Sequence, residues 1–213
     1  MEDRKFIMVL GLPRGGTSLV AKMLIELGVN MGESFVNSNH YPNYEDKGFH
    51  AVISGYAAWG NEQKRADCVK RVRDYMHKRL DEVAGPVGAK FPCISNLYGA
   101  EGWDTLPIRV VYVKRPLEDA IESDLKNYTG KNRDRAGKLN RAAEYGRMWW
   151  SQQRFLEHYE PEVTIKHEWP PEDKILTVAA LIRDEFDINP TNPGIACALS
   201  ASIDDPAKWR APA

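Results

Sequence analysis

The stretch with the clearest chemical capacity is residues 11–18, GLPRGGTS, which follows an apolar run and opens a helical pattern. Glycines let a backbone approach an anion closely, and the first amides of a helix are donors at the positive end of its dipole. The stretch matches G-x-x-x-x-G-K-[ST] except that Thr17 stands in place of the lysine. The cation is instead Arg14, whose guanidinium can direct two donors onto a phosphate or sulfate group. These residues predict an anion-binding loop; the alternative is a Gly-Pro turn with Arg14 in solvent.

A second candidate for anion binding lies far along the chain, at Arg115 and Ser123. Arg115 closely follows the run 108–113, whose β-branched and aromatic residues predict the strongest strand. Pro116 suits the first position of a helix, and the seven residues from there to Ser123 make nearly two turns. Ser123 therefore returns to the face on which Arg115 enters, so that both can bind one anion. The alternative is that Arg115 pairs locally and Ser123 is an exposed helix residue.

Two further stretches contain groups suited to anion binding or proton transfer. Lys90 lies near the end of a short buried strand predicted over 87–92, where it can reach into a site. A surface lysine with its alkyl stem on the protein is the alternative. The segment from 28 to about 61 has loop composition, with a short helix weighed over about 48–59, and contains Glu45 and His50. It is either the wall of a substrate pocket or a solvated surface loop.

Hydrophobic periodicity predicts the elements that must position these groups. Strands are expected over 6–10, 87–92, 108–113 and 161–166, and helices from 17, over about 64–83, from 116, over about 135–157 and from 171. In the long helix over 135–157, Trp149 and Trp150 are expected in the core. Strands that alternate with helices, without an internal repeat, predict an α/β fold. We expect a single domain over residues 1–213, with three αβα layers around a central parallel sheet.

The predicted sheet also indicates where a ligand should bind. In open α/β sheets, ligands lie beyond the carboxyl ends of the strands. Arg14, Lys90 and Arg115 each follow a predicted strand closely. We therefore expect these three cations to converge on one anion site.

Composition limits the classes of function. The chain has 213 residues, 43% of them hydrophobic, and 29 basic against 30 acidic residues leave a formal net charge of -1. No overall field then favours nucleic acid or an anionic membrane, so an anion site must be local. The three cysteines are widely spaced and the histidines lack ligand-like spacing, so no metal site is expected. No apolar run is long enough for an integral membrane segment, and we expect a reduced, cytoplasmic protein.

The two anion motifs together resemble those of sulfotransferases that use 3′-phosphoadenosine 5′-phosphosulfate (PAPS). Residues 11–18 resemble the family's P-loop-like 5′-phosphosulfate-binding loop. Arg115-Pro116 at the end of a strand, followed by Ser123, is similar to the family's 3′-phosphate motif in order and spacing. The likeness covers most of the chain, and Leu27-Gly28-Val29, Tyr44-Glu45-Asp46 and the Lys90-x-Pro92 strand are also similar to segments of prokaryotic and phage-type members.

The resemblance implies transfer of a sulfuryl group from PAPS to a hydroxyl or amine, leaving adenosine 3′,5′-bisphosphate, with no metal. Arg14 would stabilise the charge on the bridging oxygen as the bond to sulfur breaks. Lys90 is a further candidate catalytic residue. The 5′-phosphate would be held by the amides of Gly15, Gly16 and Thr17 and the hydroxyls of Thr17 and Ser18. Arg115 and Ser123 would hold the 3′-phosphate.

The resemblance also suggests the base. Glu45 is similar to the acidic position that many carbohydrate-type and bacterial members use to deprotonate the acceptor, and His50 is the competitor. The acceptor itself is a small molecule, carbohydrate or lipid whose identity the sequence leaves open. Two other functions stay open: a P-loop kinase acting on a small metabolite, which Thr17 disfavours, and a nucleotide-binding interaction domain without catalysis.

Overall fold

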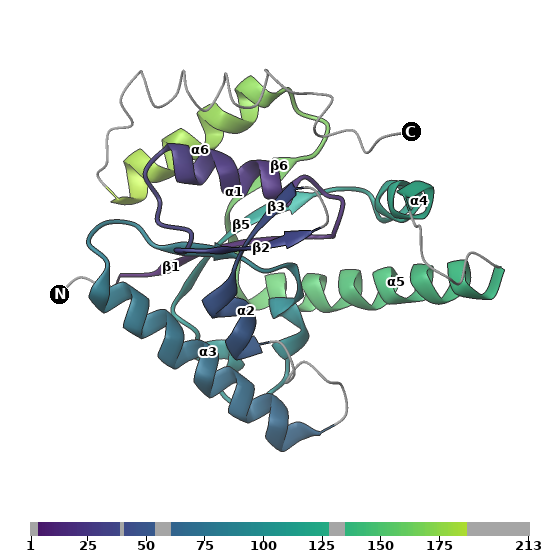
Figure 1. Cartoon of the computed structure of the whole chain (residues 1–213), viewed down its shortest axis with the longest axis horizontal. Helices are drawn as coiled ribbons and strands as arrows, with labels where there is room; N and C mark the ends of the chain where they lie inside the picture. The colour runs from purple at the N-terminus through teal and green to yellow at the C-terminus, as the bar shows by residue number, and fades with distance from the viewer. Residues whose placement is uncertain (1–3, 39–40, 54–60, 128–134, 187–213) are drawn as a thin grey trace.

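The centre of the fold is a four-stranded parallel sheet (Figure 1). The computed structural model describes residues 4–38, 41–53, 61–127 and 135–186. The strands lie in the order β4 (Gly88–Lys90), β1 (Phe6–Gly11), β5 (Ile108–Lys114) and β6 (Pro161–Lys166). Each neighbouring pair is parallel. The α/β prediction with a central parallel sheet is thus confirmed, and each of the four strands overlaps its predicted range, with β4 shorter than the predicted 87–92.

Strand β1 is buried along its whole length because helices cover both faces of the sheet. Its residues alternate between two apolar clusters, as the two-residue period of a strand requires. Phe6, Met8 and Leu10 belong to one cluster, whereas Ile7 and Val9 belong to the other. A continuous apolar run is the expected sequence of such a strand.

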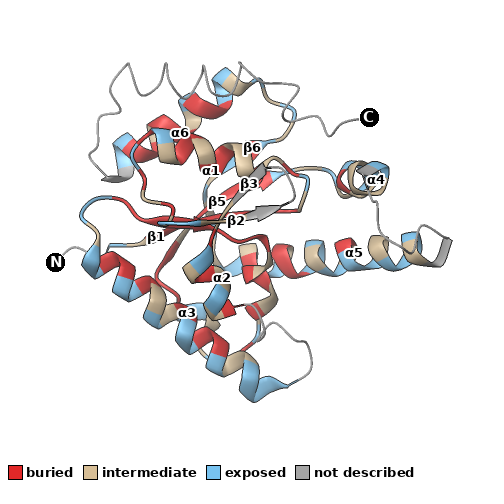
Figure 2. Cartoon of the chain, viewed as in Figure 1, coloured by how far each residue is buried: buried red, intermediate tan, exposed pale blue. Residues whose placement is uncertain are grey.

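The helices divide between the two faces (Figure 1). Helices α1 (Thr17–Glu26) and α6 (Pro171–Phe186) pack on the cluster that contains Ile7 and Val9. Helices α2 (Lys47–Ile53) and α3 (Glu62–Glu82), the 3₁₀ turn η1 (Pro92–Leu97) and the end of α5 (Arg135–His158) cover the opposite cluster. Buried residues therefore line the inner side of each helix, as Figure 2 shows.

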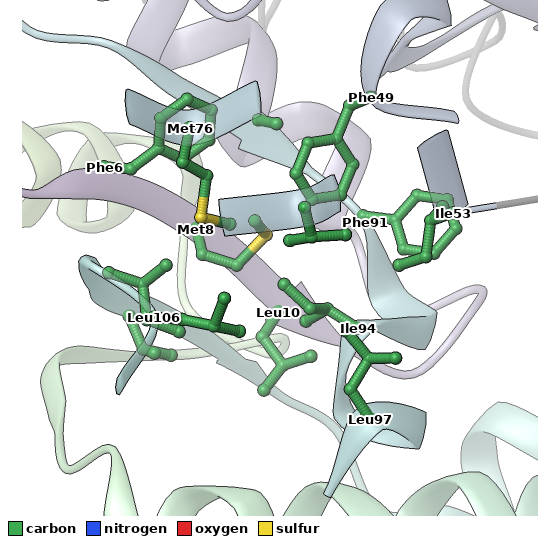
Figure 3. Close-up of a cluster of buried hydrophobic side chains, with 14 of the residues drawn as sticks. Phe6, Met8, Leu10, Phe49, Ile53, Met76, Phe91, Ile94, Leu97 and Leu106 are labelled. Atoms are coloured by element: carbon green, nitrogen blue, oxygen red, sulfur yellow. The ribbon is translucent and has the colours of Figure 1, made fainter. Parts of the chain in front are cut away.

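In the larger cluster, phenylalanine rings pack among aliphatic and methionine side chains (Figure 3). The Phe49 ring centroid lies 6.2 Å from that of Phe6 and 5.6 Å from that of Phe91. Phe49 is fully buried and stands at the start of α2, directly after the segment that contains Glu45. Packing of Phe49 therefore anchors that segment against the sheet.

The 28–61 segment is more ordered than its composition suggests. Strands β2 (Phe35–Ser38) and β3 (Tyr41–Asp46) form an antiparallel hairpin, which α2 follows directly. The expected helix over about 48–59 starts one residue earlier, and residues 54–60 lie outside the described part of the chain. The composition of this segment shows no strand period, but Phe35 and Tyr44 of the hairpin contact each other, with ring centroids 5.5 Å apart, and pack against the cluster that contains Ile7 and Val9.

The prediction of a core position for Trp149 and Trp150 is wrong. Their exposed fractions are 38% and 54%, and Leu139 on the same helix is 62% exposed. The opposite side of this part of α5 faces the fold, because Ser151 and Gln152 are buried and donate hydrogen bonds to the Ser95 and Pro92 carbonyls of η1. Trp149 and Trp150 therefore lie on the side of the helix that faces solvent. Trp150 packs instead against Tyr98, at 6.2 Å between ring centroids, and under the Arg154 guanidinium.

The remaining elements connect the strands. The 3₁₀ turn η2 (Trp103–Thr105) precedes β5, and helix α4 (Leu117–Asn127) follows it, one residue later than Pro116 suggests. The Pro116 carbonyl accepts the first helical hydrogen bond, from the Ala120 amide at 3.1 Å. Among the described helices, none is both long and apolar enough to cross a bilayer.

The strand order places the candidate residues. In the sheet, β4 lies on one side of β1 and β5 lies on the other side, so the chain crosses over β1 between these two strands. The loops that leave β1 and its neighbours therefore diverge around the carboxyl end of β1, where α/β sheets usually bind ligands. Residues 11–18 lie at this point.

Candidate functional site

The loop of residues 11–18, called the 11–18 loop below, joins β1 to α1 through a tight backbone turn. The Gly15 amide donates to the Leu12 carbonyl at 2.9 Å. Gly16 has a φ of 89° and caps α1, and Arg14 has a φ of 64°, which is uncommon outside glycine. Such backbone strain costs on the order of 1–3 kcal/mol and persists only where neighbouring groups hold it.

Close packing explains two of the glycines in the 11–18 loop. A Cβ atom at Gly11 would lie 2.6 Å from the Val113 carbonyl oxygen of β5, and one at Gly15 would lie 2.6 Å from the Leu12 carbonyl oxygen. Thr17, at the position of the missing lysine, is buried. The loop therefore sits directly against the sheet, and α1 begins with amides that have no acceptor within the helix.

On the β5 side, Arg115 holds the backbone of the 11–18 loop. Its guanidinium donates a hydrogen bond to the Arg14 carbonyl. Partial burial lowers the pKa of Arg115, Asp119 opposes this effect, and the nearby Arg14 charge adds to it. The Nε atom of Arg115 is buried and has no hydrogen-bond partner among the described residues. Arg14 is exposed, and its charge acts unfavourably on that of Arg115, an effect that a bound anion would offset.

On the β6 side, His167 contacts the neighbouring peptide of the same loop. Its Nδ1 lies 3.0 Å from the Gly15 carbonyl oxygen. Burial lowers the pKa of His167, and the Arg115 charge lowers it further. The sequence prediction missed His167, although it directly follows the predicted strand 161–166. The rule that selected Lys90 and Arg115, a chemically capable residue at the end of a strand, would also have selected His167.

On the β4 side, Lys90 links the 11–18 loop to Glu45. Its Nζ lies 3.1 Å from Ser18 Oγ and 3.1 Å from Glu45 Oε1. The Lys90 side chain is 5% exposed and that of Glu45 is 17% exposed. Burial lowers the pKa of Lys90, while the Glu45 carboxylate opposes that shift. The alternative of a surface lysine is therefore wrong, because the amine lies inside the fold between two polar partners.

The adjacent acidic residues Glu45 and Asp46 have different environments. Asp46 is buried and accepts hydrogen bonds from the Gly48 amide at 3.2 Å, from the Phe49 amide at 3.3 Å and from the Tyr75 hydroxyl. Asp46 therefore caps α2. Burial raises the pKa of Tyr75, and the hydrogen bond to Asp46 raises it further. Neighbouring side chains in a strand point to opposite sides, so Glu45 faces Lys90 instead.

The two remaining predicted residues lie on helices beside these contacts. His50 on α2 is half-buried. Its ring lies edge-on to that of Phe91, with 5.9 Å between the ring centroids, and Phe91 directly follows Lys90 in the chain. Ser123 is half-buried in the second turn of α4, the helix that begins just after Arg115. The competition between Glu45 and His50 for the role of base, and the pairing of Ser123 with Arg115, stay predictions.

The donors around the 11–18 loop suit an anion. They are the amides at the start of α1, the buried Lys90 ammonium and the Arg14 and Arg115 guanidinium groups. Within the described ranges, no three His, Cys, Asp or Glu side chains group as they would around a metal ion. A separate hollow of about 490 Å³ between β6 and α6, lined by Glu162, Leu176 and Asp184 among others, includes none of the predicted site residues.

Comparison with known proteins gives no assignment to set beside this geometry. No protein-family model matches the chain, and no curated protein matches it significantly. The functional argument therefore depends on the residues around the 11–18 loop.

Proposed function

We propose that this protein is a sulfotransferase that moves a sulfuryl group from PAPS to a hydroxyl or amine of an acceptor. One observation carries the proposal. Around the 11–18 loop, which contains Arg14, the strands on both sides of β1 each supply a cation, Lys90 from β4 and Arg115 from β5. PAPS has two separate anionic groups, a phosphosulfate and a 3′-phosphate, and cations on both sides of the loop can bind both of them.

The residues favour this donor over a nucleoside triphosphate with magnesium. Kinases of the P-loop type use a loop lysine and hold the metal through a carboxylate near the end of a neighbouring strand. Here Thr17 occupies the lysine position, and the strands that flank β1 lead into Lys90 and Lys114-Arg115. Positive charge at both strand ends suits an anionic donor that needs no metal.

The donor would be held at both of its anionic ends. The amides of Gly16 and Thr17 and the Ser18 hydroxyl would bind the 5′-phosphate, because the start of a helix favours negative charge. Arg115 and Ser123 would bind the 3′-phosphate. The buried Arg115 Nε, which has no acceptor among the described residues, supports this role because an N–H in that position gains from a bound oxygen.

The transfer itself would use the other side of the 11–18 loop. Glu45 would take the proton of the acceptor hydroxyl or amine as that atom forms a bond to sulfur. The sulfur–oxygen bond to the 5′-phosphate breaks in the same step, and adenosine 3′,5′-bisphosphate leaves. Arg14 and Lys90 would stabilise the charge that develops on the bridging oxygen and on the sulfuryl group.

A thermal-shift titration tests the choice of donor. We expect adenosine 3′,5′-bisphosphate without metal to raise Tm, since a ligand that binds only the folded state stabilises it. Stabilisation by ATP or ADP with magnesium, and none by the bisphosphate, would support the kinase instead. The acceptor, whether a small molecule, a carbohydrate or a lipid, is identified by a screen with radiolabelled PAPS. Binding of the bisphosphate without transfer to any acceptor would favour the interaction domain.

A further inference from the structure

His167 is held in place on three sides. Its amide donates to the Lys114 carbonyl at 2.9 Å, and its own carbonyl accepts from Lys174 Nζ at 2.7 Å. The third contact is the one between Nδ1 and the Gly15 carbonyl oxygen at 3.0 Å. Neighbours on β5 and α6 therefore fix the backbone so that the imidazole reaches the 11–18 loop.

The contact determines which way one peptide of the loop faces. A carbonyl oxygen only accepts hydrogen bonds, so Nδ1 must carry the hydrogen in this contact. In a planar trans peptide, the Gly15 carbonyl and the Gly16 N–H point in opposite directions. With the carbonyl turned towards His167, the Gly16 N–H is turned away from it.

Gly16 is also the residue that lets the imidazole come so close. A Cβ atom at Gly16 would lie 3.2 Å from His167 Nδ1, closer than most Cβ contacts. Gly16 has a φ of 89° and caps α1, so its amide stands at the start of the helix. Glycine at this position therefore serves both the positive φ and the packing of His167.

We propose that His167 is a positioning residue that orients the Gly16 amide towards the anion bound by the 11–18 loop. The identity of that anion as a 5′-phosphate depends on the proposed function, whereas the orienting role depends only on the contact. His167 contacts the loop carbonyl and acts on the anion through Gly16.

The charges around His167 indicate that it acts as a neutral donor. The ring faces Arg115 at the end of β5 and Lys174 on α6, both cationic, and Glu168 follows it in the chain. Burial and the Arg115 charge lower the pKa of His167, so the imidazole is neutral at neutral pH. An uncharged side chain with an N–H at the same place should therefore replace it.

The test compares His167→Asn with His167→Leu, because the two side chains have nearly the same shape and only Asn has an N–H near the Nδ1 position. Affinity for adenosine 3′,5′-bisphosphate is measured by calorimetry. We expect His167→Leu to weaken binding roughly 2- to 12-fold, the range for loss of one uncharged hydrogen bond, and His167→Asn to stay within about twofold of the unmodified protein. His77→Ala, at an exposed histidine of α3, is the control and should change nothing.

A second measurement separates orientation of the loop from general loss of structure. In ¹H–¹⁵N spectra, the Gly16 amide proton should shift downfield when the bisphosphate is added. That shift should be small in His167→Leu and restored in His167→Asn. If the unmodified protein does not bind the bisphosphate, the proposed donor is wrong, and inorganic pyrophosphate then serves as the probe for His167.

The outcomes are distinct. Equal affinity and equal Gly16 shifts in the Leu variant and the unmodified protein would overturn the role of His167, as would an Asn variant weakened as much as Leu. If His167→Leu does not fold, His167→Gln replaces it, because Gln carries its amide one carbon further out. Gln is then expected to weaken binding while Asn does not, and equal binding by the two would reject the proposal.

Discussion

The two sides of the 11–18 loop hold it by different means. On the β4 side, the buried Lys90 ammonium binds two side chains, the Ser18 hydroxyl and the Glu45 carboxylate. On the β5 and β6 side, Arg115 and His167 bind two consecutive backbone carbonyls, those of Arg14 and Gly15. One side therefore joins side chains to one another, and the other holds the backbone of the loop.

This difference suggests a division of labour. Side chains that exchange protons or face developing charge alter the rate of the chemical step when they are removed. Groups that shape an anion-binding loop alter affinity, because they act in the ground state as well as in the transition state. Variants on the β4 side should therefore lower kcat, and variants on the opposite side should weaken binding of the donor.

The largest effect is expected for Glu45→Gln. Loss of a positioned base should lower kcat by roughly 10²- to 10⁴-fold, with little change in the affinity for adenosine 3′,5′-bisphosphate. Steady-state kinetics with the acceptor from the screen measures this, and Glu33→Gln, at a side chain that is 87% exposed, is the control. If His50→Ala lowers kcat and Glu45→Gln does not, the base is His50.

Lys90→Met should follow, with kcat lowered by roughly 10²- to 10³-fold, as for loss of one group that stabilises developing charge. The variant also leaves Glu45 without its cation, so Tm must be measured alongside the rate. The double variant Lys90→Met with Glu45→Gln separates the effects, because it removes the unpaired carboxylate. Recovery of Tm in the double variant would assign the loss of stability to the unpaired carboxylate, whereas an unchanged kcat in Lys90→Met would mean that Lys90 contributes nothing to transfer.

Arg115→Ala tests the opposite side of the loop. Loss of a charged donor should weaken bisphosphate binding by roughly 10- to 150-fold in calorimetry. Ser123→Ala should weaken it by only roughly 2- to 12-fold, since an uncharged hydrogen bond is lost. If both variants bind the bisphosphate as tightly as the unmodified protein, Arg115 and Ser123 do not belong to the donor site. A lower kcat with unchanged affinity would contradict the proposed difference between the two sides of the loop.

The smallest effect is expected from the titration of His167. Because its pKa in the folded protein lies below the usual value, the unfolded chain binds the proton first as pH falls. The free energy of unfolding should therefore decrease from about pH 6.5 downwards and stop changing below the folded pKa, with full stability above that range. Urea unfolding between pH 5 and 8 measures this free energy. The decrease at low pH should be larger in the unmodified protein than in His167→Asn, and an identical pH dependence in both would argue against a lowered pKa of His167.

Much of the fold could be predicted because it depends on local patterns. The run 6–10 and the run 108–113 are continuous and apolar, as strands buried on both faces must be, and they form the two central strands. The rule that ligands bind at the carboxyl ends of such strands led to Lys90 and Arg115, both of which contact the 11–18 loop in the structure. Their roles in catalysis and binding stay predictions.

The prediction failed where the structure depends on packing between distant segments. Trp149 and Trp150 have the apolar character of core residues, yet nothing in their own sequence shows that α5 packs on η1 through the neighbouring Ser151 and Gln152 instead. The 28–61 segment has no clear period, and its fold depends on contacts with distant residues, such as Phe49 of α2 against Phe6 and Phe91. Exposure of a helix and pairing of an irregular hairpin are both decided by neighbours far away in the chain.

The sequence by itself determined the parallel α/β sheet, the glycine-rich turn after its first strand and the residues that follow the strands. These depend on hydrophobic periodicity and on the conformational freedom of glycine, which are local properties. Only the tertiary structure decided that Glu45 rather than Asp46 faces Lys90, and that His167 lies against the Gly15 carbonyl. These contacts join residues 45 and 152 positions apart in the chain. They form only in the folded protein, because the β2–β3 hairpin that contains Glu45 and the turn after β6 that contains His167 are both brought to the loop at the carboxyl end of β1.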